Sequence, residues 1–285
     1  MEKNKADQVI KILTEALPFI QKFSKKICIV KYGGAAMVEK ELKYSFARDI
    51  ALMKQVGINV IVVHGGGPQI DEQLSKVNIK RNFVDGIRIT DNKTIDVVSK
   101  TLSNVVNKEI VELINSNGAN AIGISNKENK FIKVRKYTSD KADYGYVGEI
   151  TNIDTNHFCK LMDSNYIPVI APLGFDENNN VYNINADSAA SKIASELAAE
   201  KIIFLTDQQG VLNNKKELIS SLNFEEINTL IEKEVITGGM LPKIKACLDA
   251  INNNVKMAHI VDGRIQHSVL LEIFTNEGIG TLVKK

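Results

Sequence analysis

Tryptophan is absent from this sequence, and its 285 residues include only five prolines and three cysteines. The cysteines, Cys28, Cys159 and Cys247, match no metal-ligand spacing and no disulfide framework, so we expect reduced thiols and no directly bound metal. Long apolar runs are also missing, which excludes a membrane-spanning helix, and the N-terminal residues lack the apolar segment of a signal peptide. These absences predict a cytoplasmic protein with no membrane association.

Neither sign of charge is in large excess. The sequence has 36 lysines and arginines against 34 aspartates and glutamates, for a formal net charge of +2. This balance gives no reason to expect binding to nucleic acid or to an anionic membrane surface. Apolar residues make up 44% of the chain and charged residues 25%, as in globular proteins, and the length suits two lobes or one large α/β domain.

Short apolar runs alternate with helical patterns along the chain. The runs expected to form strands are 27–32, 60–64, 120–125, 167–174, 201–207 and 280–283. The patterns expected to form helices are 7–23, 38–56, 91–117, 184–200, 237–254 and 266–274. Because most runs are apolar throughout, their strands should be covered on both faces. We therefore predict an α/β fold, a three-layer αβα sandwich around a mostly parallel open sheet.

Some segments depart from this scheme. Residues 79–90 predict a hairpin, and 130–137 and 144–153 predict antiparallel edge strands. The polar segment 174–183 is expected to be a loop between a first and a second lobe. The helix at 7–23 has an apolar stripe at helical spacing but no obvious core to cover, and a proline in it should produce a kink.

The stretch from Val60 to Ile70, VIVVHGGGPQI, joins a buried strand to a helix through three glycines and a proline. Glycines at this place allow either a tight turn or a cradle whose backbone N–H groups bind a phosphate. The motif alone does not decide between the two. We expect His64 to have a structural role, as a hydrogen-bonding group that fixes the glycine loop.

Further glycines and charged residues follow the other strands. Ligands of open parallel sheets bind beyond the carboxyl ends of the strands. This chain places there Lys31-Tyr-Gly-Gly, His64-Gly-Gly-Gly, Asn183 to Asp187, Asp207 to Gly210, and Gly238-Gly239 with Lys243. Backbone N–H and ammonium groups that meet at one edge are what the transfer of a phosphoryl group requires.

Each of these charged residues has an ordinary explanation when it is taken alone. Lys31, Lys243 and Arg88 would be surface cations, and Asp187 would be an acid in the first turn of a helix. Their common placement at strand ends favours a site instead. The chain contains neither the P-loop pattern nor a G-x-G-x-x-G after its first strand, which disfavours both of those nucleotide folds.

Eight motifs, in order along the chain, resemble the acetylglutamate kinases of the amino-acid-kinase family. They are IVKYGGAAM, VVHGGGPQI, FVDGIRITD, YVGEI, NINADSAASKIA, LTDQQGVL, TGGMLPK and GIGTLV. The resemblance covers nearly all of residues 27–285, and the helix before it resembles that of the arginine-sensitive enzymes of this family. It implies the amino-acid-kinase and carbamate-kinase fold in three parts. These are a helix at 1–24 for oligomerisation and regulation, an N-lobe at 25–178 for acetylglutamate binding and dimerisation, and a C-lobe at 179–285 for ATP binding.

The resemblance also implies a role for each matching position. The catalytic residues would be Lys31, Lys243 and Asp187, the aspartate positioning both lysines. The phosphoryl path would be lined by Gly33 and Gly34. The substrate would be held by Gly66, Gly67, Arg88 and Asn183. The nucleotide would be held by Asp207, Gln208, Gln209, Gly210, Val211, Leu212, Val235, Ile236 and Thr237. An effector site would include Phe19, Glu272 and Gly278.

The implied reaction is the ATP-dependent phosphorylation of the γ-carboxylate of N-acetyl-L-glutamate to N-acetyl-L-glutamyl 5-phosphate, the second step of arginine biosynthesis. This nucleophile is ionised at neutral pH, so it needs no general base. Mg²⁺ would bridge the ATP phosphates without a direct protein ligand. The resemblance further implies a homo-oligomer, a dimer or a hexamer made as a trimer of dimers, with L-arginine as feedback inhibitor.

Alternatives remain open at this stage. They are a related kinase, such as one resembling glutamate 5-kinase, a non-catalytic arginine sensor with the same fold, and a dinucleotide oxidoreductase. We expect no appended regulatory domain after Lys285, which disfavours an aspartate kinase. Two departures from the family pattern bear on regulation and loops: Phe19 stands where the arginine-sensitive enzymes usually have tyrosine, and GISNKENKF replaces the usual turn near 125–129.

Overall fold

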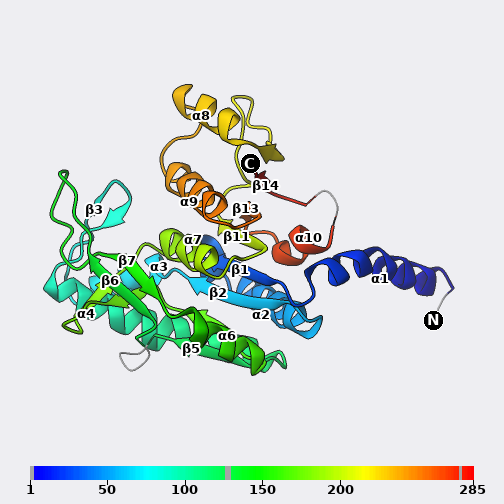
Figure 1. The fold of residues 1–285 in the computed structure, drawn as a ribbon, viewed down its shortest axis with the longest axis horizontal. Coiled ribbons are helices and arrows are strands. Elements are labelled where there is room, and N and C mark those ends of the chain that lie inside the picture. The colour runs from blue at the N-terminus through cyan, green and yellow to red at the C-terminus, as the bar shows by residue number, and fades with distance from the viewer. Residues whose placement is uncertain (1–2, 126–129, 276–277) are drawn as a thin grey trace.

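The computed structural model describes residues 3–125, 130–275 and 278–285, so most of the unusual 125–129 turn lies outside the described residues. Figure 1 shows a body of strands between helices, from which helix α1 projects. The central sheet has eight strands in the order β12-β14-β13-β11-β1-β2-β8-β5. Neighbouring strands run parallel except β13 and β14, which are antiparallel. The prediction of a mostly parallel open sheet is confirmed.

The strands at the centre of this sheet are buried. The eight strands are β1 (Ile27–Tyr32), β2 (Asn59–His64), β5 (Ala121–Ile124), β8 (Ile167–Ile170), β11 (Lys201–Thr206), β12 (Ser221–Leu222), β13 (Met257–Asp262) and β14 (Thr281–Val283). In β1, Val30 pairs with Val62 on one side and Ile203 on the other. Apolar runs of this kind suit strands that have helices on both faces.

Helices cover the two faces of the sheet. One face is covered by α6 (Thr155–Asp163), α7 (Ala186–Glu196), α8 (Phe224–Glu232) and α9 (Met240–Asn252). The other is covered by α1 (Lys3–Phe23), α2 (Lys40–Gln55), α5 (Lys108–Ser116) and α10 (Ser268–Phe274). We call the apolar cluster under the first group of helices the first core and the cluster under the second group the second core. Successive residues of β1 point to opposite faces, so Ile29 packs in the first core and Val30 in the second. Helices α6 and α8 and strand β12 were not predicted.

Two smaller sheets lie beside the main one. The first has four strands in the order β10-β9-β6-β7, namely β6 (Ile132–Lys136), β7 (Gly148–Ile153), β9 (Leu173–Phe175) and β10 (Val181–Asn183). The second is the hairpin of β3 (Phe83–Val84) and β4 (Ile87–Arg88). The predicted hairpin at 79–90 and the antiparallel pairing of β6 with β7 are both confirmed.

The segment 174–183 is not the loop that was predicted. Its ends form the antiparallel strands β9 and β10, and the predicted strand at 167–174 is divided between two sheets. The turn between β9 and β10 is closed by Asp176, whose Oδ1 accepts hydrogen bonds from the N–H groups of Asn178 and Asn180 at 2.9 and 2.8 Å. Aspartate can close a turn in this way, so polar composition here indicated a turn and not a loop.

The predicted helix at 91–117 is helical throughout, but it is not one regular α-helix. It comprises α4 (Asn92–Lys100), a π-helical segment (Thr101–Asn107) and α5. Leu102 of the π-helical segment packs in a third core with residues of α3 (Gly67–Lys76). Asn107 donates a hydrogen bond to the Val169 carbonyl at 2.9 Å. The wider turn thus fits the helix to both α3 and the sheet.

Helix α1 leaves most of its apolar stripe uncovered within the single chain. Ile10, Leu13 and Leu17 are 59%, 63% and 48% exposed, although each belongs to the predicted stripe. Phe23, at the end of the helix, is instead buried in the second core at 2% exposure. The prediction that this helix has no core of its own to cover holds for the stripe, and Phe23 anchors the helix to the body.

Candidate active site and substrate pocket

Three charged side chains meet at the carboxyl end of β1. We call Lys31, Asp187 and Lys243 the lysine–aspartate centre. Lys31 lies near the end of β1, Asp187 in the first turn of α7, and Lys243 near the start of α9. The Lys31 Nζ is 3.0 Å from Asp187 Oδ1, and the Lys243 Nζ is 2.9 Å from Asp187 Oδ2. The structure therefore brings together all three predicted catalytic residues.

The N-terminus of α7 holds Asp187 in place. Asn185 caps this helix, because its side-chain oxygen accepts hydrogen bonds from the N–H groups of Asp187 and Ser188, each at 3.0 Å. Burial alone would raise the pKa of Asp187, but the two ammonium groups outweigh this and hold its pKa at about 2. The carboxylate stays ionised at neutral pH and keeps both lysines directed toward the same point.

The glycines after β1 lie directly against this centre. A Cβ atom on Gly33 would lie 2.6 Å from the Lys31 Nζ, so a side chain there would displace the ammonium group. Gly34 has a φ of +71°, and a Cβ on it would collide with the carboxylate of Asp207. At both predicted phosphoryl-path glycines, the lack of a side chain lets a charged group lie directly against the backbone.

A cavity of about 600 Å³ lies next to the lysine–aspartate centre. Its walls come from the glycine loop after β2, the β3–β4 hairpin, and the segment that enters α7. Its lining residues include Gly66, Gly67, Asp71, Arg81, Arg88 and Asn183. At one end the cavity reaches Asn185 and Ala186, the residues before Asp187. The four predicted substrate-binding residues thus line one pocket that adjoins the lysine–aspartate centre.

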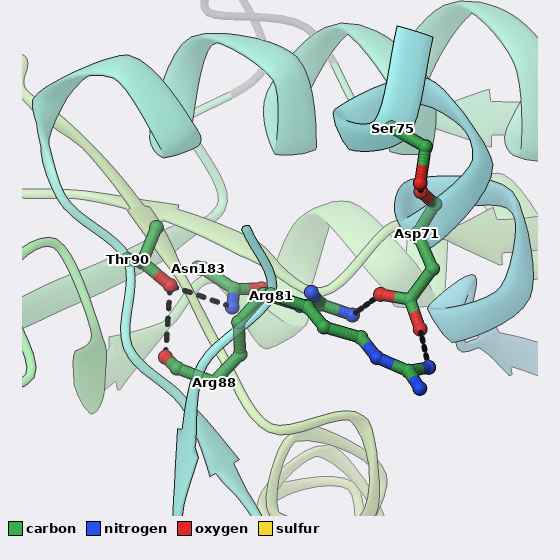
Figure 2. Close-up of polar contacts among 6 residues, drawn as sticks. All are labelled: Asp71, Ser75, Arg81, Arg88, Thr90 and Asn183. Carbon is green, nitrogen blue, oxygen red and sulfur yellow. Dashed lines mark hydrogen bonds and ion pairs between the residues drawn. The ribbon is translucent and has the colours of Figure 1, made fainter. Parts of the chain in front are cut away.

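Arg88 is buried in the wall of this pocket. Its side chain is 6% exposed, and its Nη2 donates a hydrogen bond to Asp71 Oδ1 at 2.6 Å. Its Nη1 is buried and has no hydrogen-bond partner among the described residues. Asn183, which lines the same pocket, donates a hydrogen bond from its side chain to Thr90 Oγ1 at 3.4 Å (Figure 2). Since an unpaired buried N–H is costly, this pocket is prepared for an acceptor such as a carboxylate.

His64 fixes the glycine loop and takes no part in the pocket. Its Nδ1 is 2.6 Å from the Gly65 carbonyl, and its Nε2 is 3.1 Å from the Asn107 Nδ2. These contacts require a proton on Nδ1 and a lone pair on Nε2. Burial lowers the pKa of His64 to about 4, so the ring is neutral at physiological pH. The expected structural role for His64 is confirmed.

The predicted nucleotide residues lie in two segments, one after β11 and one before α9. Asp207, Gln208 and Gln209 are exposed at the carboxyl end of β11. Val211 is buried and its N–H donates to Thr281 Oγ1 at 2.8 Å, which fixes the turn after Gly210. The remaining predicted residues are Leu212, Val235, Ile236 and Thr237, of which Thr237 is exposed just before α9. Gly34 lies against Asp207, so the first of these segments adjoins the phosphoryl path.

The predicted effector residue Glu272 is buried and already engaged. Its Oε1 is 2.5 Å from His259 Nδ1 and 3.7 Å from Lys201 Nζ, and its Oε2 accepts from the Ile279 N–H at 3.0 Å. Burial would raise the pKa of Glu272, but the hydrogen bonds from His259 and the Ile279 N–H and the charges of His259 and Lys201 together outweigh burial and lower this pKa. A Cβ on Gly278 would lie 2.8 Å from Glu272 Oε2. Phe19 is half-buried at the foot of α1, against the second core.

Sequence reasoning missed several residues of these sites. Asp71 and Arg81 line the predicted substrate pocket, Asn185 caps helix α7, and Asn107 contacts His64. Asn185 carried a usable signal, since asparagine two residues before an aspartate at a helix start is a common cap. Asp71 and Arg81 carried none, because they are ordinary charged residues of a helix and a loop.

No helix in the described ranges is both long enough and apolar enough to cross a membrane. Among the same residues, no group of three or more histidine, cysteine, aspartate or glutamate side chains could hold a metal ion.

Comparison with known proteins places the chain in a family. Residues 26–262 match the model of the amino acid kinase family. The acetylglutamate kinase of Hydrogenovibrio crunogenus is 47% identical over 99% of this chain and 98% of its own length. The acetylglutamate kinase of Campylobacter hominis is 49% identical over 99% of each chain.

Solved structures agree on the fold. The N-acetylglutamate synthase of Neisseria gonorrhoeae, complexed with coenzyme A and N-acetyl-glutamate, has a TM-score of 0.87 at 23% identity over 97% of this chain. This chain spans 63% of that synthase. The carbamate kinase of Giardia lamblia bound to AMP-PNP has a TM-score of 0.67 at 17% identity, over 92% of this chain and 99% of that one. At these identities the likeness establishes the fold alone.

Proposed function

This chain belongs to the amino acid kinase family, among its acetylglutamate kinases, and we propose how the residues described above carry out that reaction. N-acetyl-L-glutamate occupies the 600 Å³ pocket with its α-carboxylate on Arg88 and its γ-carboxylate toward the lysine–aspartate centre. The observation that carries this placement is the buried Nη1 of Arg88, which has no partner among the described residues. Gly66, Gly67 and Asn183 supply backbone and amide donors around the substrate.

The chemical task is to bring two anions together. The γ-carboxylate is ionised at neutral pH and attacks the γ-phosphoryl group of ATP, so the enzyme needs no general base. Lys31 and Lys243 face the negative charge that develops on the transferred oxygens, and Asp187 keeps the two ammonium groups in position. Gly33 and Gly34 have no side chain that would displace Lys31 or Asp207 from beside the transferred group. The bond between the γ-phosphorus and the bridging oxygen of ATP breaks as the new bond forms, and the products are ADP and the acyl phosphate N-acetyl-L-glutamyl 5-phosphate.

The second lobe, residues 179–285, is proposed to bind ATP, and residues 25–178 to bind the acetylated substrate and form a dimer. Asp207 to Leu212 and Val235 to Thr237 flank the ends of β11 and α9, next to the phosphoryl path. Mg²⁺ would accompany the nucleotide and neutralise charge on its phosphates. Asp187 has both oxygens engaged by lysines, so the cation would be held mainly by the phosphates.

A substrate comparison tests this function. N-acetyl-L-glutamate, L-glutamate and L-aspartate are supplied separately with ATP and Mg²⁺, and acyl phosphate is trapped as the hydroxamate. We expect rapid hydroxamate formation with the acetylated substrate only. Equal or faster reaction with free glutamate would identify a kinase resembling glutamate 5-kinase, and no reaction with any substrate would favour the non-catalytic sensor.

We also propose that L-arginine inhibits the enzyme from a second site, as feedback in arginine biosynthesis in the cytoplasm. Glu272 and Gly278 lie beneath the foot of α1, where the Lys201 Nζ is 5.3 Å from the ring centroid of Phe23. A guanidinium would compete there with the existing partners of Glu272. The exposed stripe of α1 would pair with its copy in a neighbouring subunit and link dimers into a hexamer. Because α1 joins the body beside Glu272, ligand binding there would alter how dimers meet.

A further inference from the structure

Asp71 lies between two guanidinium groups in the wall of the substrate pocket. Its Oδ1 accepts from Arg88 Nη2 at 2.6 Å, and its Oδ2 accepts from Arg81 Nη1 at 3.2 Å (Figure 2). The three residues come from different parts of the chain, namely α3, the segment before β3, and β4. All three line the same cavity. We call Asp71, Arg81 and Arg88 the arginine–aspartate cluster.

The contacts of Arg88 leave one of its terminal nitrogens for a ligand. Asp71 holds Nη2, and the ring of Phe83 lies against the guanidinium plane with its centroid 4.5 Å from Cζ. Nη1 has no partner among the described residues and is buried. A guanidinium that is fixed at one nitrogen and stacked on a ring cannot turn freely. An incoming carboxylate therefore meets Arg88 from a single direction.

The charge of the cluster also depends on Arg81. Two guanidinium groups and one carboxylate leave one net positive charge, which one substrate carboxylate would neutralise. Without Arg81, Arg88 and Asp71 would cancel, and the substrate would bring a second carboxylate close to Asp71 with nothing to offset the repulsion. Acetylation removes the ammonium group of glutamate, so the acetylated substrate carries two negative charges and no positive one.

These observations, together with the proposed function, lead to one inference. We propose that Asp71 is a positioning residue for Arg88, and that Arg81 offsets the charge of Asp71 so that the pocket accepts a dianionic acylated amino acid. Arg81 thereby favours the acetylated substrate over free glutamate, whose ammonium group can itself offset Asp71. Arg81 acts on the charge balance and not by direct chemistry, since its side chain is 71% exposed.

The test is a double-mutant cycle that neutralises the two charges, with a matched control. Arg81→Gln, Asp71→Asn and the double variant are compared with Arg135→Gln, a surface arginine that is also 71% exposed and pairs with Glu149 at 2.8 Å. Calorimetry measures the affinity for N-acetyl-L-glutamate, and kinetics measures KM for both substrates and Ki for free glutamate. We expect Arg81→Gln to weaken binding of the acetylated substrate about fivefold, with a smaller effect on glutamate and none on the KM for ATP.

The double variant gives the decisive result. Removing Asp71 together with Arg81 restores the net charge, and the Asn side chain still accepts from Arg88, so we expect most of the lost affinity to return. High salt should also reduce the defect of Arg81→Gln, because a charge effect is screened and a structural one is not. Double-variant affinity no better than that of Arg81→Gln would overturn the inference, as would Arg81→Gln behaving like Arg135→Gln.

The wild-type protein separates this inference from the proposed function. If wild type neither binds nor phosphorylates N-acetyl-L-glutamate, the proposed function fails. If wild type does both and the cycle shows no recovery, only the inference about Asp71 and Arg81 fails.

Discussion

The two charged clusters of this molecule share one plan and differ in their surroundings. In each, a single aspartate lies between two cations: Asp187 between two lysines, and Asp71 between two arginines. The Asp187 side chain is 10% exposed and its lysines are 9% and 18% exposed. The Asp71 side chain is 26% exposed, and one of its arginines is 71% exposed. The same arrangement is thus built once in the interior and once at the rim of a pocket.

This difference in burial suggests different tasks. A buried ion pair is strongly coupled, and removing one partner leaves an uncompensated charge in a medium of low polarity. A partly exposed pair is screened by solvent and contributes little. The lysine–aspartate centre can therefore stabilise charge that appears only in the transition state. The arginine–aspartate cluster, in our proposal, would adjust how well the ground-state substrate fits.

The largest effect is expected from the buried cluster. Lys31→Ala and Lys243→Ala should each lower kcat about a hundredfold, or on the order of 3 kcal/mol, because each removes a group that faces developing charge. The KM values should change much less. Lys245→Ala, an exposed lysine of the same helix α9, is the matched control for Lys243 and should retain full turnover. Near-normal kcat in either catalytic variant would exclude that lysine from the transition state.

The second effect is the response of the buried aspartate to acid. The pKa of Asp187 is about 2, against an ordinary value of 3.8. Because the folded pKa is depressed, its contribution of roughly 2 kcal/mol to stability is present above pH 3.8 and is lost as the pH falls toward 2. Urea unfolding should be measured for wild type and Asp187→Asn from neutral pH down to this acid range. The difference between their free energies of unfolding should be constant near neutral pH and should shrink as the pH falls. A pH-independent difference would contradict the depressed pKa.

A smaller effect is expected at the pocket. Arg88→Lys keeps the charge but loses the planar fork and its stacking on Phe83, so the KM for N-acetyl-L-glutamate should rise about tenfold. The KM for ATP should remain nearly the same, since Arg88 lies away from the predicted nucleotide segments. Steady-state kinetics with each substrate varied in turn provides the measurement. A rise in the KM for ATP instead would assign Arg88 to the nucleotide.

The smallest effect on turnover is expected from helix α1, which lies outside both clusters. Deleting residues 1–18 removes the exposed stripe and keeps Phe23, which is buried in the core. Turnover should stay within about twofold, because no residue near either aspartate is lost. Light scattering should show a dimer in place of a hexamer, and arginine should no longer inhibit. A truncated protein that stays hexameric and arginine-sensitive would remove α1 from both roles.

Sequence alone predicted the first cluster far better than the second. Lys31, Asp187 and Lys243 follow strands or begin helices, and topology brings the carboxyl ends of parallel strands together. Asp71 meets Arg81 and Arg88 only because a short hairpin folds back over α3, and no periodic pattern encodes that contact. The central strand at 27–32 was predicted to the residue, because a run of buried apolar residues leaves few alternatives.

The missed elements have physical reasons of their own. The β9–β10 pair depends on a turn closed by the Asp176 side chain, which composition alone does not distinguish from a loop. Helices α6 and α8 are nine residues each, near the lower limit at which a helical pattern can be recognised. The π-helical segment between α4 and α5 differs from an α-helix by hydrogen bonding that the side-chain pattern does not reveal.

That π-helical segment sets the phase between two halves of one long helix. An α-helix advances about 100° per residue, and a π-helical turn accommodates one extra residue within the same rise. If residues 101–107 took up regular α-helical hydrogen bonding at the same length, the extra residue would no longer be absorbed and α5 would turn by about 100° relative to α4. Leu102 packs with α3 and Asn107 contacts His64, so one of these contacts would then be lost. The glycine loop beside the pocket therefore depends on the wider hydrogen bonding of a helix that contributes little else to the site, and a further residue inserted in this stretch should be tolerated less well than a substitution.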